Sequence, residues 1–471
     1  MERTVYRADL KAVNCWNLSA MIHKTVAILL VAPVCVGAGV AAPDAAPNEA
    51  LLRMVCDLLG DADPEMRALG QEQVRGTAAV GAAATARFAA LLPNLSADAQ
   101  TGLVEALADR GDASARPAVV ALLGSKEPRV RAECLKALGA LGSGADVPLL
   151  ASNCAKGTEA ERDAARHGLV RLRGKDVDAA LLAAMAGAPP AVRIEIIAAL
   201  AARRADEALS LALRSAGDAD AGVRRAALAA VRDLAGQKEA PVLVGPLIRS
   251  FEAARTEDER AEAEEVLLTV CGRGRQACVE AVLAAMDGAG TPARVVLLRG
   301  LGRCGGEKAL GEVLARMKDP DPAVRDEAVR VLATWAGREA APHLIEMARA
   351  AGDRRTRILA FRGCVRLARG DPPDVAMLAE ALELAPRPEE RRLVLGALGD
   401  VPSSKSLALA VGCLEDPAVA DAAGAAVVRM AAKFSAGQRD QVRAALEHVL
   451  RRVRHPEVRA RAQQMLGALG R

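Results

Sequence analysis

A short motif recurs along the chain at a nearly constant interval, and it constrains the fold more than any other feature. The motif is Pro-x-Val-Arg, and its final arginine recurs every 31 residues from Arg131 to Arg224 and again from Arg294 to Arg325. An internal repeat of this length indicates a supersecondary unit stacked many times rather than one large globular core. The copies span residues 128–131, 190–193, 221–224 (as Ala-Gly-Val-Arg), 322–325 and 456–459, with a degenerate copy ending at Arg162.

Each motif opens a stretch with the apolar spacing of an amphipathic helix. Val324, Ala328 and Val331 follow one another at intervals of four and three residues, which places them on one helical face. The preceding Asp321-Pro322 is typical of a helix N-cap followed by the first turn. The glycine of Leu141-Gly142 is typical of a left-handed residue just past a helix end. The motif therefore predicts a helix whose first and last residues are marked by capping residues.

A second apolar segment follows the first helix in each unit, as over residues 146–154 and 309–317. Each unit thus contains two helices and two turns in about 31 to 36 residues. A lone hairpin cannot bury its apolar face, so neighbouring hairpins must stack. The predicted fold is all-α, an α-solenoid (superhelix) of stacked antiparallel helical hairpins, with the second helices expected to line the concave face.

The composition agrees with helices packed on helices. Hydrophobic residues make up 52% of the chain but aromatic residues only 1%, so alanine, leucine and valine must fill the core. No segment alternates β-branched or aromatic with polar residues as a strand does. The net charge of +4, with 26% charged residues of mixed sign, lacks the basic footprint of a nucleic-acid-binding protein.

These features together resemble the HEAT repeat family. The resemblance rests on the Asp/Glu-Pro-x-Val-Arg opening, the Ala/Leu stripe and the Leu-Gly ending, and it is strongest over residues 126–235, 291–347 and 455–471. The short units are similar to the bacterial HEAT-like repeats of the bilin lyase type. In such repeats the motif arginine pairs with a nearby acidic side chain, forming a ladder along the stack. The resemblance implies this structural role for Arg131, Arg193, Arg224 and Arg325.

The segment 21–42 shows the three parts of a secretory signal peptide. A basic lead at residues 21–24 precedes an apolar run over 26–36, and small residues follow up to a plausible cleavage site. The apolar run is too short for a membrane-spanning helix, which needs about 20 residues. We predict export to the periplasm or cell envelope of a bacterium, with a cytoplasmic location as the alternative. Residues 1–20 are then a non-native or disordered extension before the true start at Met21.

The rest of the chain is expected to consist of repeats throughout. Periodicity persists in its first and last parts, but the motif is degenerate there. The predicted divisions are degenerate N-terminal helical repeats over 43–125, core HEAT-like repeats over 126–352, and C-terminal HEAT-like repeats over 353–471 that end in a half repeat.

Motifs for catalysis or for metal and cofactor binding are missing from the sequence. The five histidines form no His-Glu-x-x-His motif, no cysteines form a Cys-x-x-Cys pair, and no glycine-rich run carries the Lys-Ser/Thr of a phosphate loop. The acidic residues over 257–265 fit the positive end of a helix dipole better than an acid/base pair. Cys271 and Cys278 are either bridged, if the protein is exported, or small buried hydrophobes, which we favour. We predict no catalytic residue, no cofactor and no metal.

Five basic residues fall near the ends of the predicted second helices. Stacking aligns such residues along one edge, where they form a possible binding edge for an acidic partner or a phosphate backbone. The alternative is that cations simply favour helix C-termini. The residues are Arg214, Arg249, Arg316, Lys318 and Arg349.

The resulting functional prediction is a non-enzymatic scaffold for protein–protein interaction. The identity of the protein partner does not follow from the sequence, and no membrane span is expected after removal of the leader. The alternative is a cytoplasmic bilin-lyase-like or regulatory HEAT protein. A DNA-backbone-binding protein is less favoured, because base stacking needs aromatic side chains that this chain scarcely has.

Overall fold

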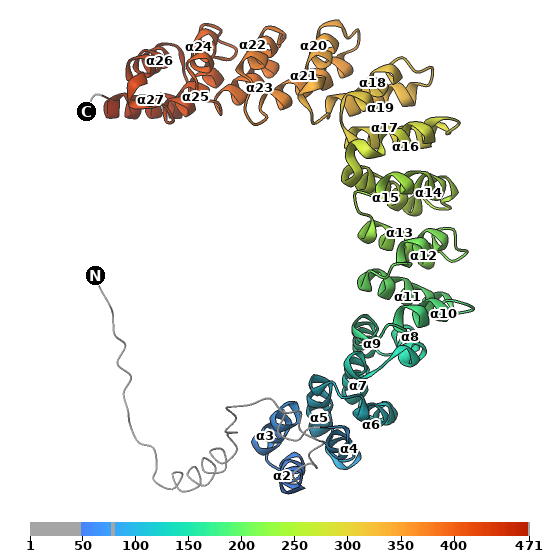
Figure 1. Cartoon of the computed structure of the whole chain (residues 1–471). Helices are drawn as coiled ribbons and strands as arrows, with labels where there is room; N and C mark the ends of the chain where they lie inside the picture. Colours follow the sequence, from blue (N-terminus) through green and yellow to red (C-terminus); the bar gives the residue numbers. More distant parts are fainter. Residues whose placement is uncertain (1–48, 77–80, 470–471) are drawn as a thin grey trace, which may run out of the picture.

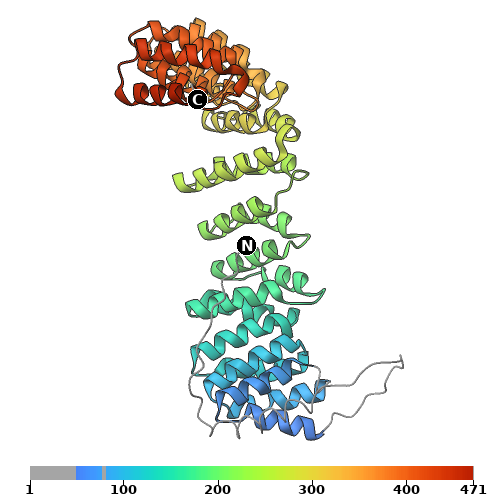
Figure 2. The same ribbon diagram turned by 90° about the vertical axis from the view of Figure 1, so that its left-hand side faces the viewer.

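The computed structural model of the chain describes residues 49–76 and 81–469. Throughout these residues every regular element is a helix, and no strand occurs. The helices stack into a curved array that forms an open arc in Figure 1 and an elongated pile of hairpins in Figure 2. The predicted all-α solenoid is confirmed. The predicted leader over 21–42 and the extension over 1–20 lie outside the described residues.

One row of helices follows the inner side of the arc in Figure 1. These inner helices carry the Pro-x-Val-Arg motif or its degenerate copies, and each packs on the next inner helix along the chain. They are α3 (Pro64–Arg75), α5 (Ala97–Arg110), α7 (Pro128–Leu141), α9 (Glu159–Arg171), α11 (Pro190–Arg203), α13 (Ala221–Leu234), α15 (Glu257–Gly274), α17 (Thr291–Cys304), α19 (Pro322–Ala333), α21 (Arg354–Ala368), α23 (Pro388–Leu398), α25 (Ala420–Ala431) and α27 (Pro456–Leu469).

A second row forms the outer side of the arc. The outer helices are mostly shorter, and several are preceded or followed by a short 3-10 turn. They are α2 (Glu49–Leu59), α4 (Ala82–Ala89), α6 (Arg116–Ala121), α8 (Val147–Lys156), α10 (Val177–Ala184), α12 (Ala208–Ser215), α14 (Ala240–Ala253), α16 (Val279–Met286), α18 (Glu307–Arg316), α20 (Ala341–Ala350), α22 (Val375–Glu383), α24 (Ser404–Gly412) and α26 (Arg439–Arg452).

The tightest hairpins join each outer helix to the inner helix that follows it. Helix α14 packs on α15 and α20 packs on α21 more extensively than an inner helix packs on the outer helix after it. The α20–α21 contact spans the division predicted at residues 352/353. Helix α27, predicted as a half repeat, packs on α26 and α25 in the same manner.

The expectation that the second helices line the concave face is wrong, because Figure 1 places the motif helices there. The reason is the small size of the residues between neighbouring inner helices. A Cβ atom added to Gly168 of α9 would lie 2.6 Å from the backbone oxygen of Leu135 in α7, and one added to Gly363 of α21 would lie 2.8 Å from that of Ala333. Inner helices therefore pack closer together than outer helices do, and the array bends toward them.

The predicted apolar stripes form the core between the two rows. Val324, Ala328 and Val331 are all buried, and Asp321 caps α19 by accepting a hydrogen bond from the backbone N–H of Ala323 at 2.9 Å. The left-handed glycine predicted after Leu141 is wrong. Gly142 has φ −88°, and a Cβ there would lie 2.6 Å from the backbone oxygen of Leu138. Lack of space, rather than backbone conformation, accounts for glycine at this position.

Candidate binding surface

The inner helices present equivalent positions to the concave face, five and nine residues after the motif arginine. In α7 and α9 these positions hold Lys136, Ala140, His167 and Arg171, which line one shallow pocket together. The corresponding positions of α11 and α13 hold Ala198, Ala202, Ala229 and Asp233, which line another pocket in the same manner. The concave face is therefore a continuous surface whose chemistry can be followed helix by helix.

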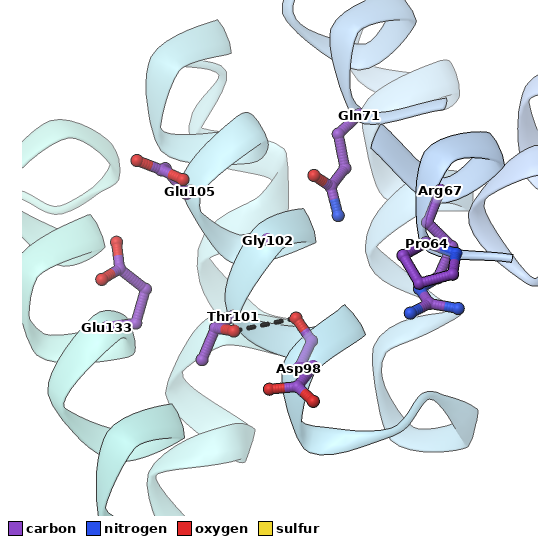
Figure 3. A pocket seen from close by; sticks show the side chains of 8 residues that line it. All are labelled: Pro64, Arg67, Gln71, Asp98, Thr101, Gly102, Glu105 and Glu133. Carbon is purple, nitrogen blue, oxygen red and sulfur yellow. Dashed lines mark hydrogen bonds between the residues drawn. The ribbon is translucent and has the colours of Figure 1, made fainter. Parts of the chain in front are cut away.

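At the N-terminal end this surface is acidic, as Figure 3 shows for the pocket between α3, α5 and α7. Asp98, Glu105 and Glu133 line the pocket together with Gln71. The carboxylates already have partners, because Asp98 pairs with Arg129 and Glu105 lies 3.5 Å from a guanidinium nitrogen of Arg75. Such paired, exposed carboxylates are typical of a polar binding face rather than of acid/base catalysis.

In the middle of the arc the concave face is lined by alanine. Ala198 and Ala202 of α11 lie beside Ala226 and Ala229 of α13, and both α11 alanines are exposed. Methyl groups let a partner approach the helices closely and cost almost no side-chain entropy when they are buried. This stretch is suited to contact with another protein surface.

Three of the predicted ladder arginines lie beside a carboxylate of the next inner helix or of the loop before it. Arg131 donates to Glu161 at 2.5 Å, Arg193 pairs with Asp218, and Arg224 pairs with Glu259. These contacts tie consecutive hairpins along one edge of the stack. We call this set of pairs the arginine ladder.

Two carboxylates of the ladder, Glu161 and Glu259, have a lowered pKa. Burial opposes ionisation of Glu161, but hydrogen bonds from Thr158 and Arg131 outweigh it, so the net effect lowers the pKa of Glu161. The backbone N–H of Arg255 and the Arg224 side chain hold the pKa of Glu259 below its ordinary value. Glu161 and Glu259 are therefore ionised around neutral pH and available to Arg131 and Arg224.

The fourth predicted ladder residue, Arg325, makes no ion pair with a carboxylate of the described residues. It donates to the backbone oxygens of Asp319 and Pro320 at 2.7 and 2.8 Å. The Asp319 carboxylate instead lies 3.4 Å from Arg294 and 3.3 Å from Arg316. Sequence reasoning did not assign Arg294 to the ladder because its motif is the degenerate Thr-Pro-Ala-Arg, although its 31-residue spacing from Arg325 was a usable signal.

The ladder also contains pairs that the motif did not reveal. Arg357 of α21 donates to Glu390 at 2.5 Å, and Arg391 of α23 donates to Asp416 at 2.5 Å. Both arginines occupy the motif position in units where proline or valine of the motif is replaced. Repeat phase, rather than the motif itself, identifies them.

The five residues of the predicted binding edge lie on or just after outer helices, away from the concave face. Arg316 is bound by Glu312 at 2.6 Å and by Asp319, and Arg349 lies 2.7 Å from Glu380. Arg214, Arg249 and Lys318 are exposed, and they make no hydrogen bond or ion pair with the residues that the structure describes. Two residues of the edge therefore take part in ion pairs within the protein, and the other three are exposed cations without a partner among the described residues.

Three buried cysteines gather where α15 meets α17. Cys271, Cys278 and Cys304 are free thiols, and Cys304 donates to the backbone oxygen of Cys271 at 3.9 Å. Hydrogen bonds with the two neighbouring thiols, together with burial, raise the pKa of Cys271. Among the residues that the structure describes, no group of three or more His, Cys, Asp or Glu side chains is arranged to hold a metal ion.

Comparison with known proteins identifies the repeat. The family model for HEAT repeats matches residues 84–170 and 279–363. None of the curated proteins matches the sequence. The similarity to bilin lyases in particular stays a prediction.

Solved structures with a similar arrangement of helices include karyopherins. Kap121p bound to Ste12p is 13% identical, with a TM-score of 0.47, over 89% of this chain and 53% of that one, so the chain spans about half the length of Kap121p. Kap95p in a complex with RanGDP is 12% identical, with a TM-score of 0.44, over 89% of this chain and 68% of that one. An engineered protein is 16% identical, with a TM-score of 0.27, over 89% of this chain and 99% of that one.

The helices themselves agree with the family match. None of the described helices is long and apolar enough to cross a membrane. The matched regions include inner and outer helices from both halves of the arc, and the arginine ladder runs through both. The chain contains HEAT repeats.

Proposed function

We propose that this protein is a non-enzymatic scaffold that binds a protein partner along its concave face. The observation that carries the proposal is the alanine-lined stretch of α11 and α13, where Ala198 and Ala202 are exposed in the middle of a continuous inner surface. Because alanine side chains are small, the middle of the inner row leaves room for a partner that the arc surrounds. The Asp98 carboxylate on this face is paired with Arg129, and the described part of the chain contains no cluster of side chains that could hold a metal ion.

Recognition on such a surface is spread over many modest contacts. Each inner helix offers only a few side chains, so a partner has to cross several hairpins to bury the roughly 1,000 Å² or more that a specific interface needs. Single substitutions on the concave face should therefore weaken binding by degrees rather than abolish it.

Site-specific photo-crosslinking tests the proposal. p-Benzoylphenylalanine in place of Ala198 samples the concave face, and the same residue in place of the exposed Ala183 of α10 samples the outer row. We expect position 198 to give one discrete product, crosslinked to a labelled partner protein. An excess of the same partner without label should compete for the concave face and remove that labelled product. Equal crosslinking from both positions, or none from Ala198 in cells that express the partner, contradicts the proposal.

We further propose that the scaffold is exported and works in the periplasm or cell envelope of a bacterium. Support comes from the signal-peptide pattern over 21–42. Cell fractionation followed by N-terminal sequencing of the purified protein tests the location. A chain that begins after residue 42 in the envelope fraction supports export, whereas an intact N-terminus in the cytosol supports the cytoplasmic, regulatory alternative.

A further inference from the structure

The charge carried by the inner helices changes sign between α15 and α17. Helix α15 opens with a run of acidic residues, Glu257-Asp258-Glu259, and continues with three more glutamates. Helix α17 contains three arginines and no acidic residue, and α21 contains five arginines and no acidic residue. Asp326 and Glu327 are the acidic residues of α19, which lies between them. The inner side of α17, α19 and α21 is therefore a basic band.

Repeat register places the arginines of this band on the concave face. Arg299 and Arg303 lie five and nine residues after the motif arginine of α17, at the positions that line the concave pockets of α7 and α9. Arg330 of α19, and Arg362 and Arg366 of α21, occupy the same positions. Three consecutive inner helices thus present arginine at equivalent places.

Contacts between helices hold several of these arginines in place. Glu327 is 5% exposed and accepts hydrogen bonds from Arg299 at 2.8 Å and Arg330 at 2.6 Å, so one buried carboxylate links α17 to α19. Arg366 donates to backbone oxygens at the end of α19, which include that of Ala333 at 3.3 Å. Arg299, Arg330 and Arg366 are therefore held by the packing between the inner helices.

The band has more positive charge than its own carboxylates neutralise. Arg303 and Arg362 are exposed, and no hydrogen bond or ion pair joins either of them to the residues that the structure describes. Two guanidinium groups are therefore free to bind carboxylates from outside, each in a bidentate manner.

Ile358 and Leu359 lie one helical turn before Arg362 on α21, on the same side of the helix. Ile358 and Leu359 of α21 are half-buried, and Leu393 of the next inner helix is 40% exposed. A phosphate backbone makes no use of exposed leucine and isoleucine, whereas a peptide with both acidic and apolar side chains satisfies both parts of the surface. The exposed Glu257, Asp258 and Glu265 of α15 would repel such a peptide, which marks one limit of the site.

We propose that the basic band of α17, α19 and α21 binds an acidic, leucine-containing segment of the partner protein. This inference rests on the proposed scaffold function and adds to it the chemistry and the place of the contact. Carboxylates of the segment bind Arg303 and Arg362, and its apolar side chains pack on Ile358 and Leu393.

Fluorescence anisotropy with a labelled peptide rich in glutamate and leucine tests the inference on the full chain. The variant Arg303→Glu/Arg362→Glu reverses the free charges of the band. The variant Arg214→Glu/Arg249→Glu reverses two exposed arginines of the outer row, with the same change in net charge. We expect the dissociation constant to rise about tenfold or more in the first variant and to stay unchanged in the second. Circular dichroism verifies that both variants are folded.

Each alternative outcome overturns the inference. An equal loss in both variants indicates general charge attraction, and a loss only in the Arg214/Arg249 variant assigns acidic partners to the outer edge instead. Equal affinity for a matched lysine–leucine peptide removes the role of charge. Tighter binding of duplex DNA, lost in the Arg303/Arg362 variant, assigns the band to nucleic acid. If the peptide does not bind while the Ala198 crosslink persists, the scaffold function stands and only this inference fails.

Discussion

Asp319 lies in the loop between α18 and α19. Its carboxylate is 3.4 Å from the guanidinium of Arg294, which is 25 residues earlier in the chain. The Asp319 side chain is only 2% exposed, so this pair is shielded from solvent. The backbone oxygen of the same aspartate accepts a hydrogen bond from Arg325. One residue thereby connects two successive motif arginines, and the hairpins that carry them are held in register.

Loss of a ladder arginine should destabilise the array. We expect Arg193→Ala to reduce the free energy of unfolding by about 1 to 2 kcal/mol, because it leaves the largely buried Asp218 carboxylate without its charged partner. Urea unfolding followed by circular dichroism measures the change. Arg214→Ala removes an exposed arginine that has no partner in the described structure and serves as the control. Equal effects of the two substitutions would show that the ladder contributes nothing.

A charge between hairpins should be worse than a lost ladder pair. Leu138 of α7 is completely buried, so Leu138→Asp places an unpaired carboxylate in the core and should cost about 3 kcal/mol or more. Leu393→Asp introduces the same side chain at a position that is 40% exposed, where we expect a small effect. Thermal melts and the yield of soluble protein distinguish the two variants. A stable Leu138→Asp protein would contradict the continuous core.

The close approach of α7 and α9 predicts opposite effects for two glycine substitutions. Gly168→Ala forces the helices apart and should destabilise the protein by about 1 to 3 kcal/mol. Gly311→Ala in α18 meets no atom within 4 Å and should stabilise it by up to about 1 kcal/mol through helix propensity. Urea unfolding gives both signs, and small-angle X-ray scattering should detect a change in the arc only for Gly168→Ala. The same sign in both variants refutes the packing argument.

Acid should weaken the stack through its carboxylates. Hydrogen bonds from Arg299 and Arg330 outweigh burial and lower the pKa of Glu327 in the folded chain below the value of 4.5 for an unperturbed glutamate. A lowered folded-state pKa stabilises the protein above the unfolded value, and this contribution disappears as the pH falls through the folded value. We expect the free energy of unfolding to fall between about pH 5 and about pH 3.

The variant Glu327→Gln isolates the contribution of this carboxylate. It should show a weaker pH dependence than the parent over the same range, whereas the exposed Glu346→Gln should match the parent. Urea unfolding at several pH values provides the comparison. A parent protein with stability independent of pH in this range would contradict the prediction.

Buried thiols should resist alkylation. Burial raises the pKa of Cys134, Cys154 and Cys364 to about 12 each, so their reactive thiolates are scarce near neutral pH. We expect iodoacetamide to modify these cysteines only after denaturation, and to modify the half-buried Cys56 and Cys413 earlier. Peptide mass spectrometry locates each product. Rapid labelling of Cys134 in the native protein would show that the hairpins open readily.

The helices and their order could be predicted because the residues of each helix indicate where it begins and ends and which face is apolar. Asp321-Pro322 starts α19 as the sequence indicates, and Val324 and Ala328 are buried as their spacing predicts. The concave face could not be predicted in this manner. It depends on how closely neighbouring inner helices approach, which Gly168 and Leu135 decide across 33 positions of sequence.

The same limit explains what was missed at the candidate site. Once the inner row is known, the repeat phase alone places Arg299, Arg330 and Arg362 on one surface, although no single unit marks them as special. The basic edge expected from the ends of the second helices includes Arg214 and Arg249, and these residues lie on the outer row. The error concerned the direction of curvature and not the helices themselves.

The contact of Gly168 with the backbone of Leu135 has a mechanical consequence. Where two inner helices meet through backbone atoms, no side chain remains to yield under compression. The outer helices, which pack less extensively on one another, have more freedom to move. Under load the arc should therefore resist curling more tightly but straighten with comparatively little force, so that it can adjust to partners broader than its resting opening.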